Sequence, residues 1–160
     1  MTIQVGDRVP EATLMKATAD GPQPVETKAF FAGRKVALFS VPGAFTPTCS
    51  VRHLPGFVER ADELGRKGVD EVACVAVNDA FVLQAWKEQA GAEGKVTMLS
   101  DGNGEFAEAL GLVMDASKYG MGRRGQRWSA IVEDGTVRQL NVEEPGAFSV
   151  SGADHLIGQL

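Results

Sequence analysis

Cys49 is the residue whose neighbours in the chain most clearly indicate chemistry. It follows an apolar run, Val36–Val41, and the segment Pro-Gly-Ala-Phe-Thr-Pro-Thr. A short apolar run broken by Pro-Gly is typical of a buried strand of a parallel sheet that ends in a turn. The Thr-Pro-Thr directly before the cysteine then indicates a helix start, with a hydroxyl as the N-cap and proline in the first turn. The sequence therefore places Cys49 in the first turn of a helix.

That position favours a cysteine thiolate over the neutral thiol. Unpaired N–H groups and the positive end of the helix dipole both attract negative charge. The thiolate is also the nucleophilic form of cysteine. We therefore predict that Cys49 is a nucleophile that is largely ionised at neutral pH. The alternative, from the residues alone, is a small buried side chain, which is the usual fate of a free cysteine.

The elements that must position this residue alternate between strands and helices. Further apolar runs predict a short edge strand at Ala12–Lys16 and buried strands at Val72–Val77 and Val96–Leu99. The dipeptide Asp134-Gly135 predicts a hairpin between strands 128–133 and 136–142, and a last helix is expected over about 152–158. This order predicts an α/β protein with a mixed central sheet flanked by helices, for which the thioredoxin-like fold is the simplest architecture.

Three more helices are expected between the strands. The helix that opens near Cys49 should pack on the sheet through an apolar stripe and should kink at Pro55. The members of that stripe are Val51, Leu54, Val58, Ala61 and Leu64. A second helix, capped at Asn78-Asp79, should run from Ala80 to Gln89 with Phe81, Ala85 and Trp86 towards the core. A third should start at Asp101 or Asn103 and end at Leu110, ahead of a glycine-rich loop over 119–125.

The composition is that of an ordinary folded protein and excludes several classes. The 160 residues, 44% of them hydrophobic and 23% charged, suit one domain that spans residues 1–160. A net charge of −5 argues against nucleic acid as a partner. No apolar stretch approaches membrane-spanning length, and the first residues lack the apolar core of a secretory signal. With two cysteines and no disulfide framework, we expect a cytoplasmic protein that binds neither nucleic acid nor membrane.

Pro42, Thr46 and Cys49 form the pattern proline-x-x-x-threonine-x-x-cysteine. This pattern resembles the peroxidatic motif of the peroxiredoxins, and the fuller string Val-Pro-Gly-Ala-Phe-Thr-Pro-Thr-Cys-Ser resembles in particular their type-five branch, called type II in plants. The likeness continues in order over nearly the whole chain. Its further segments are His53–Phe57, Val77–Phe81, Leu99–Asp101, Arg127–Ser129 and Leu140–Val142.

The resemblance implies a thiol-specific peroxidase that reduces hydrogen peroxide and alkyl hydroperoxides through a sulfenic acid on Cys49. In the family pattern the thiolate of Cys49 attacks the peroxide, while Thr46 and Arg127 bind it. Pro42 shields the sulfur and shapes the pocket. The implied catalytic residues are therefore these four, and no bound cofactor is implied.

Taken singly, three of these residues have simpler interpretations. Thr46 is also a suitable N-cap, and Pro42 is also a common turn residue after a strand. Arg127 would usually be a solvated charge, as we expect Arg123 and Arg124 to be. Spacing alone does not select one of the three arginines, so the choice of Arg127 depends on the resemblance.

The two cysteines bear on how the sulfenic acid is reduced. Animal enzymes of this branch carry a second cysteine in the late loop, whereas the matching stretch here, Gly146–Gly152, contains none. Cys74 lies within an apolar strand and is expected to be an inert core residue. We therefore expect a one-cysteine mechanism in which an external thiol, glutathione followed by glutaredoxin, attacks Cys49. Thioredoxin as the reductant, or a peroxide sensor that relays oxidation to another protein, are the alternatives.

Two further expectations concern assembly and metals. The resemblance implies a homodimer packed through loops around the active site, with Phe45, Phe81 and the 119–121 loop as contacts. Cys49 and His53 stand four apart, a spacing that also suits a metal pair or a Cys–His dyad. Only His155 and Cys74 are left as further nitrogen and sulfur ligands. We therefore expect no metal site, and we expect His53 to pack or hydrogen-bond beneath the helix.

Overall fold

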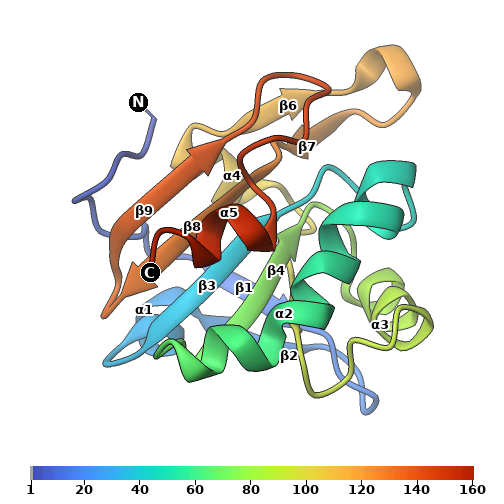
Figure 1. The fold of residues 1–160 in the computed structure, drawn as a ribbon. Coiled ribbons are helices and arrows are strands. Elements are labelled where there is room, and N and C mark those ends of the chain that lie inside the picture. Colours follow the sequence, from blue (N-terminus) through green and yellow to red (C-terminus); the bar gives the residue numbers. More distant parts are fainter. Residues whose placement is uncertain (1) are drawn as a thin grey trace.

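A seven-stranded mixed sheet forms the centre of the molecule in this computed structural model, which describes residues 2–160 (Figure 1). The strand order is β2-β1-β5-β4-β3-β8-β9. Strands β3, β4 and β5 are parallel, whereas β1, β2, β8 and β9 pair antiparallel with their neighbours. The strands are β1 Thr13–Lys16, β2 Gln23–Glu26, β3 Lys35–Ser40, β4 Glu71–Ala76, β5 Thr97–Ser100, β8 Trp128–Glu133 and β9 Thr136–Val142.

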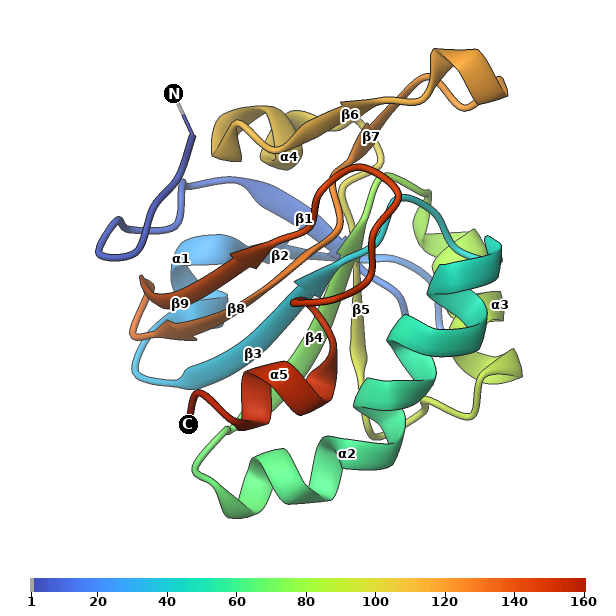
Figure 2. The same ribbon diagram turned by 45° about the horizontal axis from the view of Figure 1, so that its top comes forward.

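Helices cover both faces of this sheet (Figures 1 and 2). Helices α2, α3 and α5 pack on one face and α1 and α4 on the other. The helices are α1 Thr27–Phe31, α2 Leu54–Arg66, α3 Ala80–Gln89, α4 Glu105–Leu110 and α5 Ala153–Ile157, with a π-helix over Cys49–His53 and a 3₁₀ turn over Ser117–Tyr119. This is the thioredoxin-like α/β fold that the order of elements predicted. None of the helices in residues 2–160 is both long enough and apolar enough to cross a membrane.

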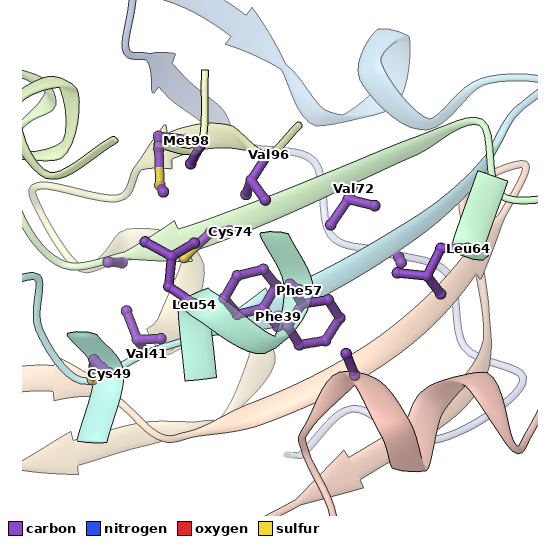
Figure 3. Close-up of a cluster of buried hydrophobic side chains, with 14 of the residues drawn as sticks. Phe39, Val41, Cys49, Leu54, Phe57, Leu64, Val72, Cys74, Val96 and Met98 are labelled. Carbon is purple, nitrogen blue, oxygen red and sulfur yellow. The ribbon is translucent and has the colours of Figure 1, made fainter. Parts of the chain in front are cut away.

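The two helical layers explain why the central strands read as continuous apolar runs. In β3 and β4 every residue after the first is buried, because alternate side chains enter the two cores on opposite faces of the sheet. Figure 3 shows the core under α2, in which Phe39 of β3 stacks on Phe57 of α2 with ring centroids 4.1 Å apart. The site described below lies at one end of this core.

Several local expectations were wrong. Val51, Phe81 and Ala85 were expected to face the core but are exposed, Val51 and Phe81 by 73% and 71%. Val51 lies in the π-helix, whose wider turn breaks the period on which the predicted stripe depended, and Phe81 is the second residue of α3. The glycine-rich loop contains a short strand, β7 (Arg123–Gly125), which pairs with β6 (Val113–Asp115). The sequence analysis also missed β2 and α1, which are too short to show a period.

Candidate active site

A tight turn after β3 leads directly to Cys49. The backbone N–H of Ser50 donates to the Thr46 carbonyl at 2.9 Å, so the helix begins where the sequence placed it. Its next turn is widened into a π-helix, in which the N–H of Leu54 donates to the Cys49 carbonyl. Pro55 has no backbone N–H and cannot donate a hydrogen bond to the carbonyl four residues earlier. A π-helical turn accommodates this missing hydrogen bond. The irregularity expected at Pro55 therefore lies just before it and contains the cysteine.

Thr46 does not cap the helix with its side chain. Its hydroxyl donates to the Gly43 carbonyl at 2.7 Å, and Thr48 makes no side-chain cap either. The side-chain cap predicted for this helix was therefore wrong. Phe45, between Gly43 and Thr46, has φ +65°, a conformation that costs a non-glycine residue energy and that clusters at functional sites. Pro42 is half-buried at the start of this same turn, directly after the strand.

Arg127 is the arginine that reaches the sulfur. It directly precedes β8, which pairs antiparallel with β3 so that Trp128 lies opposite Ser40 at the end of β3. Its Nη2 donates to Cys49 Sγ at 3.1 Å, and Cys49 itself is fully buried. A charged donor on a sulfur inside the protein favours the anionic form. The register of two antiparallel strands thus selects Arg127, which the spacing of three arginines did not.

The other two arginines differ from each other. Arg123 is exposed and lies 3.5 Å from Glu108, as expected of a solvated charge. Arg124 is half-buried instead, and its guanidinium donates to the carbonyls of Val77 and Met121 at 3.0 and 2.9 Å. The expectation that Arg124 is solvated was therefore wrong. Its role is to hold loops together beside the site.

His53 lies beneath the cysteine, fully buried. Its Nδ1 accepts a hydrogen bond from Arg127 Nη1 at 2.9 Å, and its Nε2 donates to the Ser151 carbonyl at 2.9 Å. The ring also packs against Phe39 and Phe148, with centroids 4.9 and 5.0 Å away. Burial and the neighbouring Arg127 charge lower the pKa of His53 to about 3. His53 therefore packs and hydrogen-bonds as a neutral ring, as the sequence analysis expected.

Both ring nitrogens of His53 are thus engaged by other groups. Within residues 2–160 no three His, Cys, Asp or Glu side chains gather into a metal-binding group. The pairing of His53 with Arg127, rather than with the cysteine, also gives no Cys–His dyad at this site.

We predict that His53 makes the fold less stable as the pH falls below 6.5, its ordinary pKa. Between pH 6.5 and about pH 3, His53 is protonated in the unfolded chain but stays neutral in the folded protein. The free energy of unfolding therefore falls by about 1.4 kcal/mol for each unit by which the pH is lowered. Urea unfolding between about pH 7 and 5 measures this slope. The variant His53→Gln should flatten it, and the same change at the exposed His155 should not. An unchanged slope in His53→Gln would contradict the neutral buried ring.

Cys74 occupies a different setting. It is fully buried in the middle of β4, and both cysteines are free thiols. Burial raises the pKa of the Cys74 thiol well above its ordinary value, and the nearby Cys49 raises it further. In the view of Figure 3, Val41 and Leu54 lie between the two cysteines. Cys74 is therefore a neutral core thiol, as expected.

Two residues at the far end of this network were not anticipated. Ser151 supplies the carbonyl that His53 donates to, and Glu143 binds the loop that carries Ser151. No motif marks either residue in the sequence. Together with the buried sulfur and its arginine, the arrangement defines a thiol-based redox protein with a thioredoxin-like fold.

Comparison with known proteins gives the family. A family model described as Redoxin matches residues 4–157. Peroxiredoxin-2E-2, chloroplastic, of Oryza sativa subsp. japonica is 53% identical over 99% of this chain and 73% of its own length. A crystal structure of reduced Prx3 in complex with H₂O₂ from Vibrio vulnificus has a TM-score of 0.95 at 48% identity, covering 99% of both chains. The chain therefore belongs to the peroxiredoxin family and is a peroxidase.

The expected cytoplasmic location is contradicted by the same comparison. The rice relative is named as chloroplastic, and so is Peroxiredoxin-2E of Arabidopsis thaliana, which is 45% identical over 99% of this chain and 70% of its own length. Composition and cysteine content were the basis of the cytoplasmic expectation. Proteins of every reducing compartment can have such a composition and cysteine content, so these features could not distinguish one compartment from another.

Proposed function

We propose that Cys49 is the peroxidatic residue of this enzyme, with Arg127, Thr46 and Pro42 completing its active site. The observation that carries the proposal is the hydrogen bond from Arg127 Nη2 to Cys49 Sγ at 3.1 Å. A peroxidatic cysteine must react as the thiolate, and a permanently charged guanidinium stabilises that anion. The ionised state of Cys49 itself stays a prediction.

In the first step the Cys49 thiolate attacks one oxygen of the hydroperoxide. A sulfur–oxygen bond forms to the OH oxygen, which keeps its hydrogen, and the oxygen–oxygen bond breaks. The sulfur becomes sulfenic acid, and the other oxygen leaves as hydroxide or alkoxide and takes a proton from solvent to give water or alcohol. The leaving oxygen carries developing negative charge, which Arg127 is placed to stabilise. The Thr46 hydroxyl donates its hydrogen bond to the Gly43 carbonyl. Its oxygen is therefore free to accept a hydrogen bond from the OH group of the peroxide.

We propose that an external thiol then reduces the sulfenic acid, forming a mixed disulfide with Cys49 and releasing water. The neutral, fully buried Cys74 is a poor internal partner, because disulfide formation needs a thiolate within reach. Glutathione followed by glutaredoxin is the proposed donor, since a tripeptide reaches a buried sulfur more easily than a folded protein does. The relatives' peroxiredoxin names fit a thioredoxin-dependent enzyme, which is the second candidate.

Intact-mass measurement after one equivalent of peroxide, followed by glutathione, tests this step. We expect a glutathione adduct on Cys49 in the wild-type protein and in Cys74→Ala. A mass corresponding to an internal disulfide, or loss of turnover in Cys74→Ala, would show instead that Cys74 resolves the intermediate. Turnover assays coupled to NADPH, with glutaredoxin or thioredoxin supplied in turn, decide between the two donors. Consumption of only one peroxide per protein in both assays would indicate the sensor instead.

We also propose that the enzyme is a homodimer of the type-five branch. Two plant relatives are named Peroxiredoxin-2E-2 and Peroxiredoxin-2E. These names support the branch, because the type-five branch is called type II in plants. Exposed apolar side chains near the site support the dimer, because large contiguous apolar patches are rare on monomers. They are Phe45, Val51, Phe81 and Tyr119. The loop between β6 and β7, which contains Tyr119, lies against the active-site turn, with Met121 next to Gly43.

Sedimentation velocity tests the dimer. Phe81→Arg should convert a dimer into a monomer, because a buried unpaired charge is costly at an interface. Val5→Arg is the matched control, since Val5 is 58% exposed and lies in the N-terminal segment rather than near Cys49. A wild-type monomer, or equal behaviour of the two variants, would contradict the proposed interface.

A further inference from the structure

Glu143 lies at the end of β9, buried, and is bound to Arg127 through the main chain. Its backbone N–H donates to the Arg127 carbonyl at 3.0 Å, and its side chain is 7% exposed. A carboxylate this deeply buried needs hydrogen bonds to offset the loss of water. Neither the peroxide chemistry nor the proposed reduction step uses this group.

The partners of that carboxylate all come from one loop. Glu143 Oε2 accepts from the backbone N–H groups of Ser149, Val150 and Ser151, each at 2.8 Å, and from the Ser151 hydroxyl at 2.7 Å. Although burial raises its pKa, these hydrogen bonds hold the pKa of Glu143 below the ordinary value. The side chain thus fixes the loop 143–151 in the shape in which the Ser151 carbonyl faces His53.

That carbonyl decides which nitrogen of His53 carries the proton. A carbonyl only accepts, so Nε2 must be the N–H, and the neutral ring then has its lone pair on Nδ1. Nδ1 in turn accepts from Arg127 Nη1, while Nη2 of the same guanidinium donates to Cys49 Sγ. The other tautomer would set two N–H donors against each other at Nδ1. The guanidinium would then lose one of its two fixed partners.

We propose that Glu143 is a positioning residue of the peroxide reaction, which acts through Ser151 and the His53 tautomer to aim the Arg127 guanidinium at the Cys49 sulfur. The inference rests on the peroxide reaction at Cys49. It adds a residue whose effect reaches the sulfur through three hydrogen-bonded groups. The neighbouring Glu144 is exposed and accepts a hydrogen bond from the Ala147 N–H through its backbone carbonyl, so it provides a matched control.

The rate constant of the peroxide reaction, measured by stopped flow, tests the proposal. Glu143→Ala should lower it about tenfold, because small displacements of a catalytic group cost that much or more. Glu143→Gln keeps an oxygen acceptor of the same size and should recover most of the rate, whereas Glu144→Ala should leave it unchanged. In an Arg127→Ala background, Glu143→Ala should have less than about a twofold further effect. The same tenfold loss in both backgrounds would overturn the proposal, because it would show a general structural effect.

A spectroscopic measurement tests the same idea, and its first readout, on the unmutated protein, does not depend on a variant that folds. The chain has two histidines, so ¹⁵N-histidine labelling resolves both rings. We expect His53 as the neutral Nε2–H tautomer at neutral pH, and we expect Glu143→Ala to populate the other tautomer. A His53 ring that is charged or protonated on Nδ1 in the wild-type protein would overturn the proposal. This readout is independent of turnover, so a failure of Cys49 to reduce peroxide would be recognised separately.

Discussion

Replacing Cys49 with serine should abolish peroxide reduction, with a loss of roughly 10⁴-fold or more in the rate constant. A serine hydroxyl is not ionised at neutral pH and is a far weaker nucleophile towards a peroxide oxygen than a thiolate. Arg127 would then face a neutral oxygen in place of the sulfur that it contacts at 3.1 Å. Peroxide consumption in the presence of excess reductant measures the effect.

The control for this prediction is the other buried cysteine. Cys74→Ala removes a thiol from the middle of β4 and should keep the peroxide rate constant within about twofold, since Cys74 lies in the apolar core, outside the hydrogen bonds that join Cys49, Arg127 and His53. Thermal unfolding of both variants would show that each still folds. Undiminished peroxide consumption by Cys49→Ser would remove the basis of the proposed mechanism.

The main features of the fold could be predicted because they depend on local patterns. The runs at β3 and β4 are buried on both faces, so they read as continuous apolar segments, and Asp134-Gly135 marks the β8–β9 hairpin directly. Asp79 caps α3 through the N–H of Val82 at 2.9 Å, as its position before the helix suggested. Among the shortest elements, β1, β5 and α5 were expected, whereas β2, β7 and α1 carry no such pattern and were missed or only expected as loop.

The site was predictable only in part, because its partners meet through the sheet and not along the chain. The Pro-x-x-x-Thr-x-x-Cys segment is local, so Cys49 and its helix start could be placed from sequence. The pairing of β8 with β3 is what brings Arg127 to the sulfur, and the last loop brings Ser151 to His53. Contacts between residues so far apart in the chain produce no characteristic spacing of residues in the sequence. The family resemblance selected Arg127, but nothing selected Glu143.

Arg127→Ala should lower the peroxide rate constant by about 10²–10³-fold, the loss typical of removing one transition-state donor. The change removes both the positive charge that contacts the Cys49 sulfur and the hydrogen-bond donor to His53 Nδ1. Arg127→Lys should recover only part of the loss, because a single ammonium cannot reproduce two donors from one planar group. Stopped-flow measurement of the first oxidation step separates this effect from any change in reduction by thiols.

The neighbouring arginines make this prediction specific. Arg123→Ala removes an exposed charge and should have almost no effect. Arg124→Ala removes two hydrogen bonds to loop carbonyls and should lower stability by about 1–3 kcal/mol, with a much smaller loss of rate than Arg127→Ala. Equal losses of rate from Arg124→Ala and Arg127→Ala would mean that the guanidinium at the sulfur contributes only structure. The chemistry would then have to be attributed to the thiolate and the helix start alone.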